Sequence, residues 1–143
     1  MNILLEKLKT WIAAYPGWQE NVTLYVDYLG CVPGCAGVYP QGVEVLARRE
    51  DVLGGVKERR RLRAMVYRVA GQEEDFARDA AWWEDFCGWV AAQSAAGLAP
   101  RFGNTEDREF VQARGGRLVR MPSAGTGVYG VEIVAEYWTQ MGD

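Results

Sequence analysis

The order of hydrophobic patterns along the chain is the feature that most limits what it can fold into. A segment with apolar residues at three- and four-residue spacing comes first, and several segments with alternating apolar residues follow. A second helical pattern comes next, and further alternating segments end the chain. Because helical and extended patterns do not alternate regularly, we expect an α+β fold and not a doubly wound one. The 143-residue length predicts one domain, residues 1–143, with an antiparallel or mixed β-sheet and two main helices packed on one face.

The two helical segments each have a clear apolar stripe and a clear end. The first extends from Leu4 to Tyr15 and is stopped by Pro16-Gly17. The second extends from Glu73 to Ala96 and is ended by Gly97. This second helix carries three tryptophans, which could form a ligand platform. Aromatic stripes at this spacing are usually core, and we favour that interpretation.

Strands are predicted by alternating patterns in the remaining segments, at 22–29, 38–48, 59–70, 108–113, 117–121 and 128–138. In the second of these segments the strand is expected to be short. The segment 59–70 has apolar residues on both faces of its second half, so we expect it at the centre of the sheet. The dipeptide Gly115-Gly116 predicts a hairpin turn between two of the later strands.

The chain has no histidine, which removes whole classes of chemistry. Ser-His-Asp and Cys-His nucleophiles, histidine-ligated metals and an imidazole pH switch are all excluded. The glycine-rich segments do not match a phosphate-binding loop, and adjacent acidic pairs lie on different sides of a helix or in turns. We therefore predict that the protein is not an enzyme and that it has no catalytic, cofactor-binding or metal-binding residues.

Three cysteines, Cys31, Cys35 and Cys87, are an odd number, which favours reduced thiols over a disulfide framework. Cys31 and Cys35 have C-x3-C spacing in a loop rich in proline and glycine. A zinc ion bound there would lack its third and fourth ligands. We therefore favour small loop residues over a zinc site.

The formal charge of −3 gives no general attraction to nucleic acid, but the charge is unevenly distributed. Eight basic residues face three acidic ones from Arg48 to Arg68, and six acidic residues face one arginine from Glu73 to Asp85. These two segments supply the candidate protein-contact residues: Arg59, Arg60, Arg61, Arg63, Glu73, Glu74, Asp75 and Asp79.

Each charged segment has a second interpretation. The basic run KERRRLR at 57–63 could contact phosphate, but a charged sheet edge or strand end, or a protein contact, is favoured because the whole chain is acidic. If Arg61 and Arg63 share a sheet face with Glu132 and Glu136, part of this charge is satisfied within the fold. The acidic cluster is favoured as a complement to the positive end of the helix dipole over a role at an interface.

No stretch of the sequence approaches 18 consecutive apolar residues, and charged residues interrupt the N-terminal hydrophobic run. The sequence therefore predicts neither a membrane span nor a signal peptide, and no contact with a membrane.

Six pieces of sequence in a fixed order carry a family resemblance. They are LLEKLKTWI (4–12), LYVDYLG (24–30), VYPQGVEVLARRE (38–50), RLRAMVYRVAG (61–71), FCGWVAAQSAAGLAP (86–100) and VYGVEIVAEYW (128–138). In this order and spacing the chain resembles small prophage proteins of low-GC Gram-positive bacteria (Firmicutes), described as minor capsid or tail-terminator-like. The chain departs from the pattern in the cysteine-bearing loop at 31–35 and in its heavier arginine content.

The resemblance implies an α+β subunit that assembles as a ring, such as a hexamer, at the end of a phage tail tube and joins tail to head. The implied partners are other copies of the chain, the tail-tube protein and head-completion proteins, with nucleic acid met only as DNA in a channel. The implied location is the bacterial cytoplasm during assembly and the head-tail joint of the virion afterwards. A head-side connector or another minor capsid protein is the nearest alternative, and a small-molecule-binding domain is the distant one.

Overall fold

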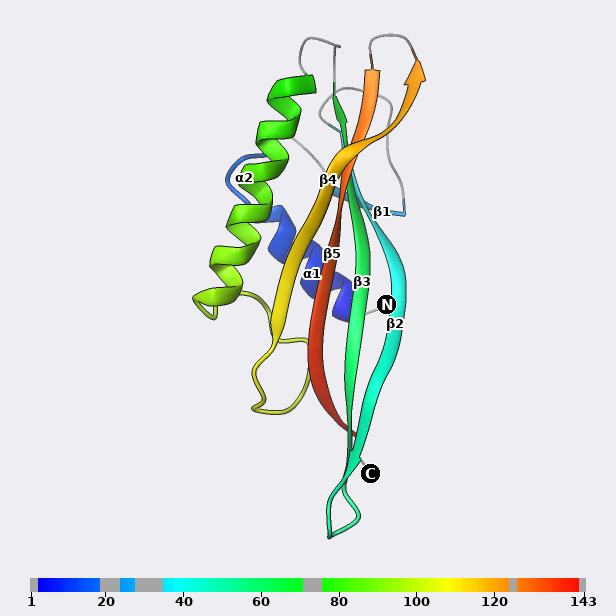
Figure 1. Cartoon of the computed structure of the whole chain (residues 1–143), viewed down its shortest axis with the longest axis vertical. Helices are drawn as coiled ribbons and strands as arrows, with labels where there is room; N and C mark the ends of the chain where they lie inside the picture. The colour runs from blue at the N-terminus through cyan, green and yellow to red at the C-terminus, as the bar shows by residue number, and fades with distance from the viewer. Residues whose placement is uncertain (1–2, 19–23, 28–34, 71–75, 124–125, 142–143) are drawn as a thin grey trace.

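The computed structural model describes residues 3–18, 24–27, 35–70, 76–123 and 126–141 (Figure 1). The elements in chain order are α1 (Ile3–Ala13), β1 (Leu24–Val26), β2 (Ala36–Glu50), β3 (Val56–Ala70), α2 (Phe76–Ala95), β4 (Phe110–Ser123) and β5 (Thr126–Met141). The strands form one five-stranded sheet in the order β1-β2-β3-β5-β4. Because β1 pairs with β2 in parallel and the other pairs are antiparallel, the sheet is mixed, which confirms the α+β prediction for a single small domain.

Both helices pack on one face of the sheet, as predicted. The α2 side chains Trp83, Phe86 and Val90 are buried, and their three- and four-residue spacing places them on one side of the helix. Leu8 and Ile12 are likewise buried and lie on one side of α1. They meet every second residue of the central strands, and the buried sheet residues of this core include Leu62, Ala64, Val66, Val131, Ile133 and Ala135.

The predicted central position of β3 is confirmed. The strand pairs with β2 on one side from Val56 to Arg68, and with β5 on the other side over its whole length. Leu62, Ala64 and Val66 face the core, while Met65 and Tyr67 on the opposite face are half-buried. The segment is therefore covered on both faces only in part.

The predicted hairpin at Gly115-Gly116 is wrong. β4 continues through this dipeptide, and its pairing with β5 shifts register between Arg114 and Arg117. Gly115 has a φ of 76°, the left-handed conformation that a glycine supplies in a β-bulge. The hairpin instead joins β4 to β5, whose pairing begins at Ser123 and Thr126. The described residues after α2 thus form two strands where three were predicted.

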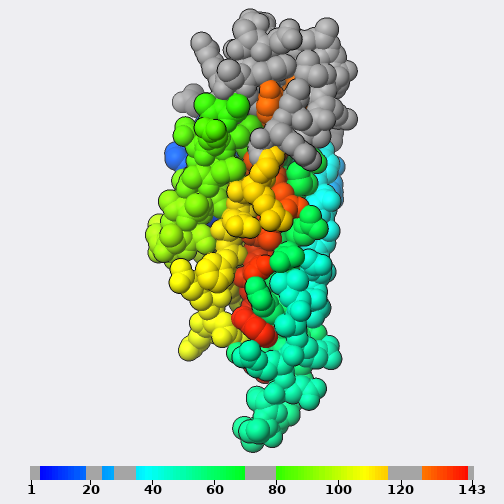
Figure 2. All heavy atoms as spheres, in the orientation of Figure 1, coloured from blue at the N-terminus to red at the C-terminus, as the bar shows by residue number. Residues whose placement is uncertain are grey.

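The strand predicted as short at 38–48 is also longer than expected. β2 covers 15 residues and follows β3 down to the turn at Asp51–Gly55, with register shifts after Pro40 and Val45. From residue 41 to residue 50 nearly every side chain is exposed on both faces, so the alternation of a half-buried strand is absent there. We call residues 42–55 the arm. Figures 1 and 2 show its turn projecting at one end of the molecule.

Candidate protein-contact surface

The basic run on β3 forms a ladder of ion pairs with β5 on the sheet face away from the helices. Arg61 lies directly opposite Glu136 in the antiparallel register, and its Nη2 lies 2.8 Å from Oε1 of that carboxylate. Arg59 reaches the other oxygen of Glu136, at 2.5 Å. Arg63 and Arg114 both contact Glu132, so this carboxylate joins β3 and β4 across β5. The predicted shared face of Arg61 and Arg63 with Glu132 and Glu136 is confirmed.

This ladder changes the interpretation of the basic run. β3 is central, so the expectation that its arginines protect a sheet edge is wrong. Arg59, Arg61 and Arg63 are directed at carboxylates of the same chain, which leaves less positive charge for a phosphate backbone. Partly exposed pairs of this kind contribute only about 0–1 kcal/mol each. The ladder therefore gives the sheet face a fixed pattern of charge more than it stabilises the fold.

The fourth candidate, Arg60, lies on the opposite face of β3 and belongs to a different cluster. Its Nη2 donates to Oε1 of Glu58 at 2.7 Å, while Nη2 of Arg48 on β2 donates to Oε2 at 2.7 Å. Hydrogen bonds from Arg48 and Arg60 hold the pKa of Glu58 below its usual value. Sequence reasoning missed this carboxylate because a single glutamate within a basic run reads as solvated charge.

Stability should fall at acidic pH and stay constant near neutral pH. Hydrogen bonds from arginine lower the pKa of Glu132 and Glu136 from the usual 4.5, so their contribution is complete above pH 4.5 and is lost as the pH falls through the lowered folded-state values. With no histidine in the chain, we expect a constant urea midpoint between about pH 5 and 8 and a fall below 4.5. A Glu136→Gln variant should show a shallower acid limb. A midpoint that rises on acidification would contradict this assignment.

The acidic candidates are not placed by the structure. Glu73, Glu74 and Asp75 lie outside the described residues, and Asp79 lies in α2 with a side chain that is not described. Their role at the start of the helix or at an interface stays a prediction.

The cysteines and the tryptophans offer no ligand site in the described residues. Cys31 lies outside them, and Cys35 is a half-buried free thiol. No group of three or more potential metal ligands occurs within the described part of the chain. The tryptophans of α2 pack into the core, where Trp89 stacks on Trp11 at 5.2 Å and Trp82 lies parallel to Phe86 at 5.7 Å. This packing supports the core interpretation over a ligand platform.

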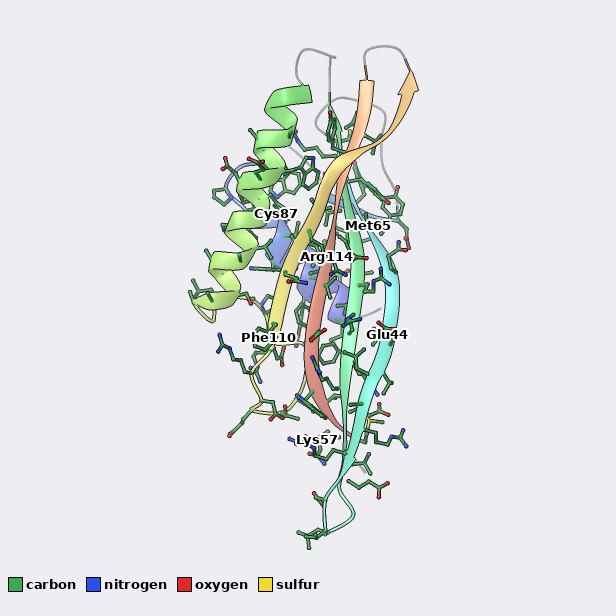
Figure 3. The ribbon with its side chains drawn as sticks, viewed as in Figure 1. Glu44, Lys57, Met65, Cys87, Phe110 and Arg114 are labelled. Atoms are coloured by element: carbon green, nitrogen blue, oxygen red, sulfur yellow. The ribbon has the colours of Figure 1, made fainter. Side chains whose placement is uncertain are left out.

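The most exposed apolar side chains lie at the tip of the arm, where Val52 is fully exposed and Leu53 is 93% exposed. Leu98 after α2 and Phe110 at the start of β4 follow, at 64% and 54%. Figure 3 shows Phe110 at the start of β4, on the side of the sheet remote from Glu44 in β2. The sequence signal for the exposed tip is the apolar pair Val52-Leu53 inside a turn rich in glycine.

Two shallow depressions flank the start of β4. One has a volume of about 190 Å³ and is lined by Arg59, Arg108, Phe110, Glu136, Tyr137 and Trp138. The other has a volume of about 200 Å³ and lies at the end of α2, where its lining residues include Gly97, Ala99 and Val111. Arg108 lines both, and its guanidinium carbon lies 5.0 Å from the centre of the Phe110 ring.

Neither helix, within the residues the structure describes, is long and apolar enough to cross a membrane. A comparison of the sequence with protein-family models and with curated proteins finds no match.

Proposed function

We propose that this chain is a structural subunit of a phage or prophage virion, a tail terminator that assembles as a ring at the end of the tail tube and joins tail to head. The observation that carries the proposal is a sheet with an open strand at each side. β4 pairs only with β5, and β2 has β1 beside it only at Ala36–Val38. Over the rest of β2 and of β4, the outer edge meets no other strand of the described chain, although the backbone N–H of Val111 on β4 donates to Oγ of Ser94 on α2.

Open edges of this length are unusual in a protein that works alone. Unpaired backbone N–H and C=O groups invite pairing with another chain, so isolated domains usually keep edge strands short or cover them. Two different open edges on one subunit allow a head-to-tail contact, in which one edge of each copy meets the other edge of the next. If each copy is rotated relative to the previous one by an angle that closes the circle, this contact produces a ring.

The fold is compatible with the subunit that the family resemblance implies. The chain forms a helix, three strands, a second helix and two strands, with both helices on one face. In such a ring the helices of every copy would lie on the same wall and the charged sheet face on the other. The paired charges of Arg61 and Glu136 suit a wall that meets solvent or DNA without holding DNA tightly.

The distant alternative, a small-molecule-binding domain, has less support. Its aromatic helix would have to enclose a pocket, and in the described residues those rings pack against each other and against the core. The depressions beside β4 are open to solvent and shallow.

Electron microscopy of lysates tests this proposal in a strain that carries the gene within an inducible prophage. After deletion of the gene, we expect DNA-filled heads and separate tails that fail to join, and plasmid-borne expression of the chain should restore complete particles. Emptied heads beside tails of normal length would favour the head-side connector. Normal, joined particles in the deletion strain would contradict a role in the virion joint.

A further inference from the structure

The tip of the arm presents its apolar side chains on an ordered support. Oδ1 of Asp51 accepts hydrogen bonds from the backbone N–H groups of Leu53 and Gly55, both at 2.8 Å, and Gly54 supplies the left-handed φ of 85° that the turn needs. Immediately after the turn, β3 is paired with β5 from its first residue, Val56. Val52 and Leu53 are therefore held out into solvent by a fixed turn, at a free-energy cost that burial against a partner would recover.

The start of β4 offers a receiving surface of matching chemistry. The depression beside Phe110 has a volume of about 190 Å³, and three of its lining residues are aromatic: Phe110, Tyr137 and Trp138. Even a cavity of about 150 Å³ holds a benzene-sized group, so a leucine side chain fits. Arg59, Glu136 and Arg108 supply the charges around the depression; Arg59 pairs with Glu136, which leaves Arg108 in excess, whereas Glu50 and Asp51 lie next to the apolar tip of the arm. We call Val52 and Leu53 the knob and this depression the socket, and their local charges are opposite.

We propose that the arm of one copy adds to the outer edge of β4 in the next copy, with Val52 and Leu53 seated against Phe110. The occupant of the socket is a second copy of this chain. Pairing along the strand supplies backbone hydrogen bonds, and the tip supplies the side-chain contact that fixes the register.

Strand directions allow this contact. β2 runs toward the tip of the arm and β4 runs away from it, so the two open edges meet as antiparallel strands when both copies have the same orientation (Figure 1). Antiparallel pairing is the arrangement that neighbouring strands of this sheet already use from β2 to β4.

Distance requires that the contact be made between copies. Phe110 pairs with Glu136, Glu136 with Arg61, and Arg61 with Glu44, so Phe110 and Glu44 lie at the same level of the sheet. From Glu44 to Glu50, the last residue of β2, the strand rises roughly 20 Å, and the turn that carries Leu53 lies just beyond it. A neighbour displaced along the strands by about 20 Å brings the lower half of β2 beside β4 and its tip beside Phe110. Closed rings of tilted strands have a stagger of this kind.

The inference rests on the proposed function, because a second copy is its occupant, and complementing variants test it directly. Leu53→Ser removes the knob and Phe110→Ser removes the socket; both side chains are exposed, so folding should be unaffected. Tyr25→Ser, at an exposed aromatic on β1 and away from the arm, is the matched control. Each of the first two variants should weaken self-association at least tenfold in sedimentation experiments. A mixture of the two should form one-to-one dimers that grow no further, because only one intact knob and one intact socket remain.

A photo-crosslinker placed at residue 53 identifies the contacted surface. Equal amounts of unlabelled and ¹⁵N-labelled chain should give crosslinks between copies, and these should map to residues 108–111 or 136–138. The same experiment is carried out on rings assembled on tail tubes, so that a chain monomeric in isolation is still tested.

The outcomes separate the two proposals. Assembly that is unchanged by Leu53→Ser, or crosslinks from residue 53 to another virion protein or to a different surface, would overturn the arm contact and leave the structural role intact. A chain that forms no assembly, alone or on tail tubes, would overturn both. Loss of association with Tyr25→Ser to the same extent would show a general effect and contradict the arm contact.

Discussion

A Phe86→Ala variant is expected to lose about 3–5 kcal/mol of unfolding free energy, the cost of an alanine in place of a fully buried phenylalanine. Phe86 is 0% exposed and lies where α2 packs against the residues that follow α1. Its ring packs against Tyr15 at 5.2 Å in an edge-to-face arrangement and against Trp83 at 5.6 Å. Removal of the ring leaves a cavity and deletes contacts that join α2 to the segment after α1. Urea denaturation followed by tryptophan fluorescence measures the loss.

Phe110→Ala is the matched control for this prediction, because it removes the same side chain from an exposed position. At dilute concentration it should change the unfolding free energy by no more than about 0.5 kcal/mol. If the two alanine variants were equally stable, the core between the helices would not be where the structure places it.

Gly103→Ala is expected to cost about 1–3 kcal/mol, because a methyl group has no room there. A Cβ at this position would lie 2.0 Å from the backbone carbonyl oxygen of Trp138, and backbone cannot rotate away as a side chain can. The loop is also held by Glu109, whose carboxylate accepts hydrogen bonds from the N–H groups of Phe102 and Gly103. The loop from α2 to β4 must therefore shift away from β5 or distort it, and thermal unfolding should show a lower midpoint.

Gly88→Ala is the opposing control. Gly88 is an exposed position in the middle of α2, and a Cβ there meets nothing within 4 Å. Alanine should stabilise the protein by about 0.4–1 kcal/mol, because it reduces the freedom of the unfolded chain and favours the helix. A Gly103→Ala variant as stable as Gly88→Ala would show that the loop does not pack on Trp138.

The sequence predicted the fold class well because the core residues follow simple periods. Trp83, Phe86 and Val90 lie on one side of a helix, and Leu62, Ala64 and Val66 lie on one side of a strand. The same period of two correctly placed Arg61 and Glu136 on a common face. These predictions needed only local geometry together with the correct strand neighbours.

The errors arose where tertiary pairing overrides a local signal. Gly115-Gly116 is a good turn dipeptide, but β5 lies alongside on both sides of it, so the left-handed glycine forms a bulge and β4 continues. In β2 the lower half is exposed on both faces, and a strand with no buried face shows no alternation that a sequence pattern could reveal.

The candidate surface was predicted only in part. The arginines of β3 were expected to contact a partner, yet most of them contact carboxylates of their own chain. The apolar tip was missed because Val52 and Leu53 occur in an Asp-Val-Leu-Gly-Gly turn, and whether a turn is covered or projects depends on how far the strands before and after it extend. That length is set by the pairing of β2 with β3.

Mass spectrometry of purified phage particles, with the chain quantified against the major tail protein, tests the central claim most directly. If the protein is a ring-forming terminator, it should be present in a small fixed number of copies per particle, six for a hexameric ring, and antibody label should lie at the joint between head and tail. Absence of the chain from purified joined particles, or label confined to another part of the virion, would contradict the account.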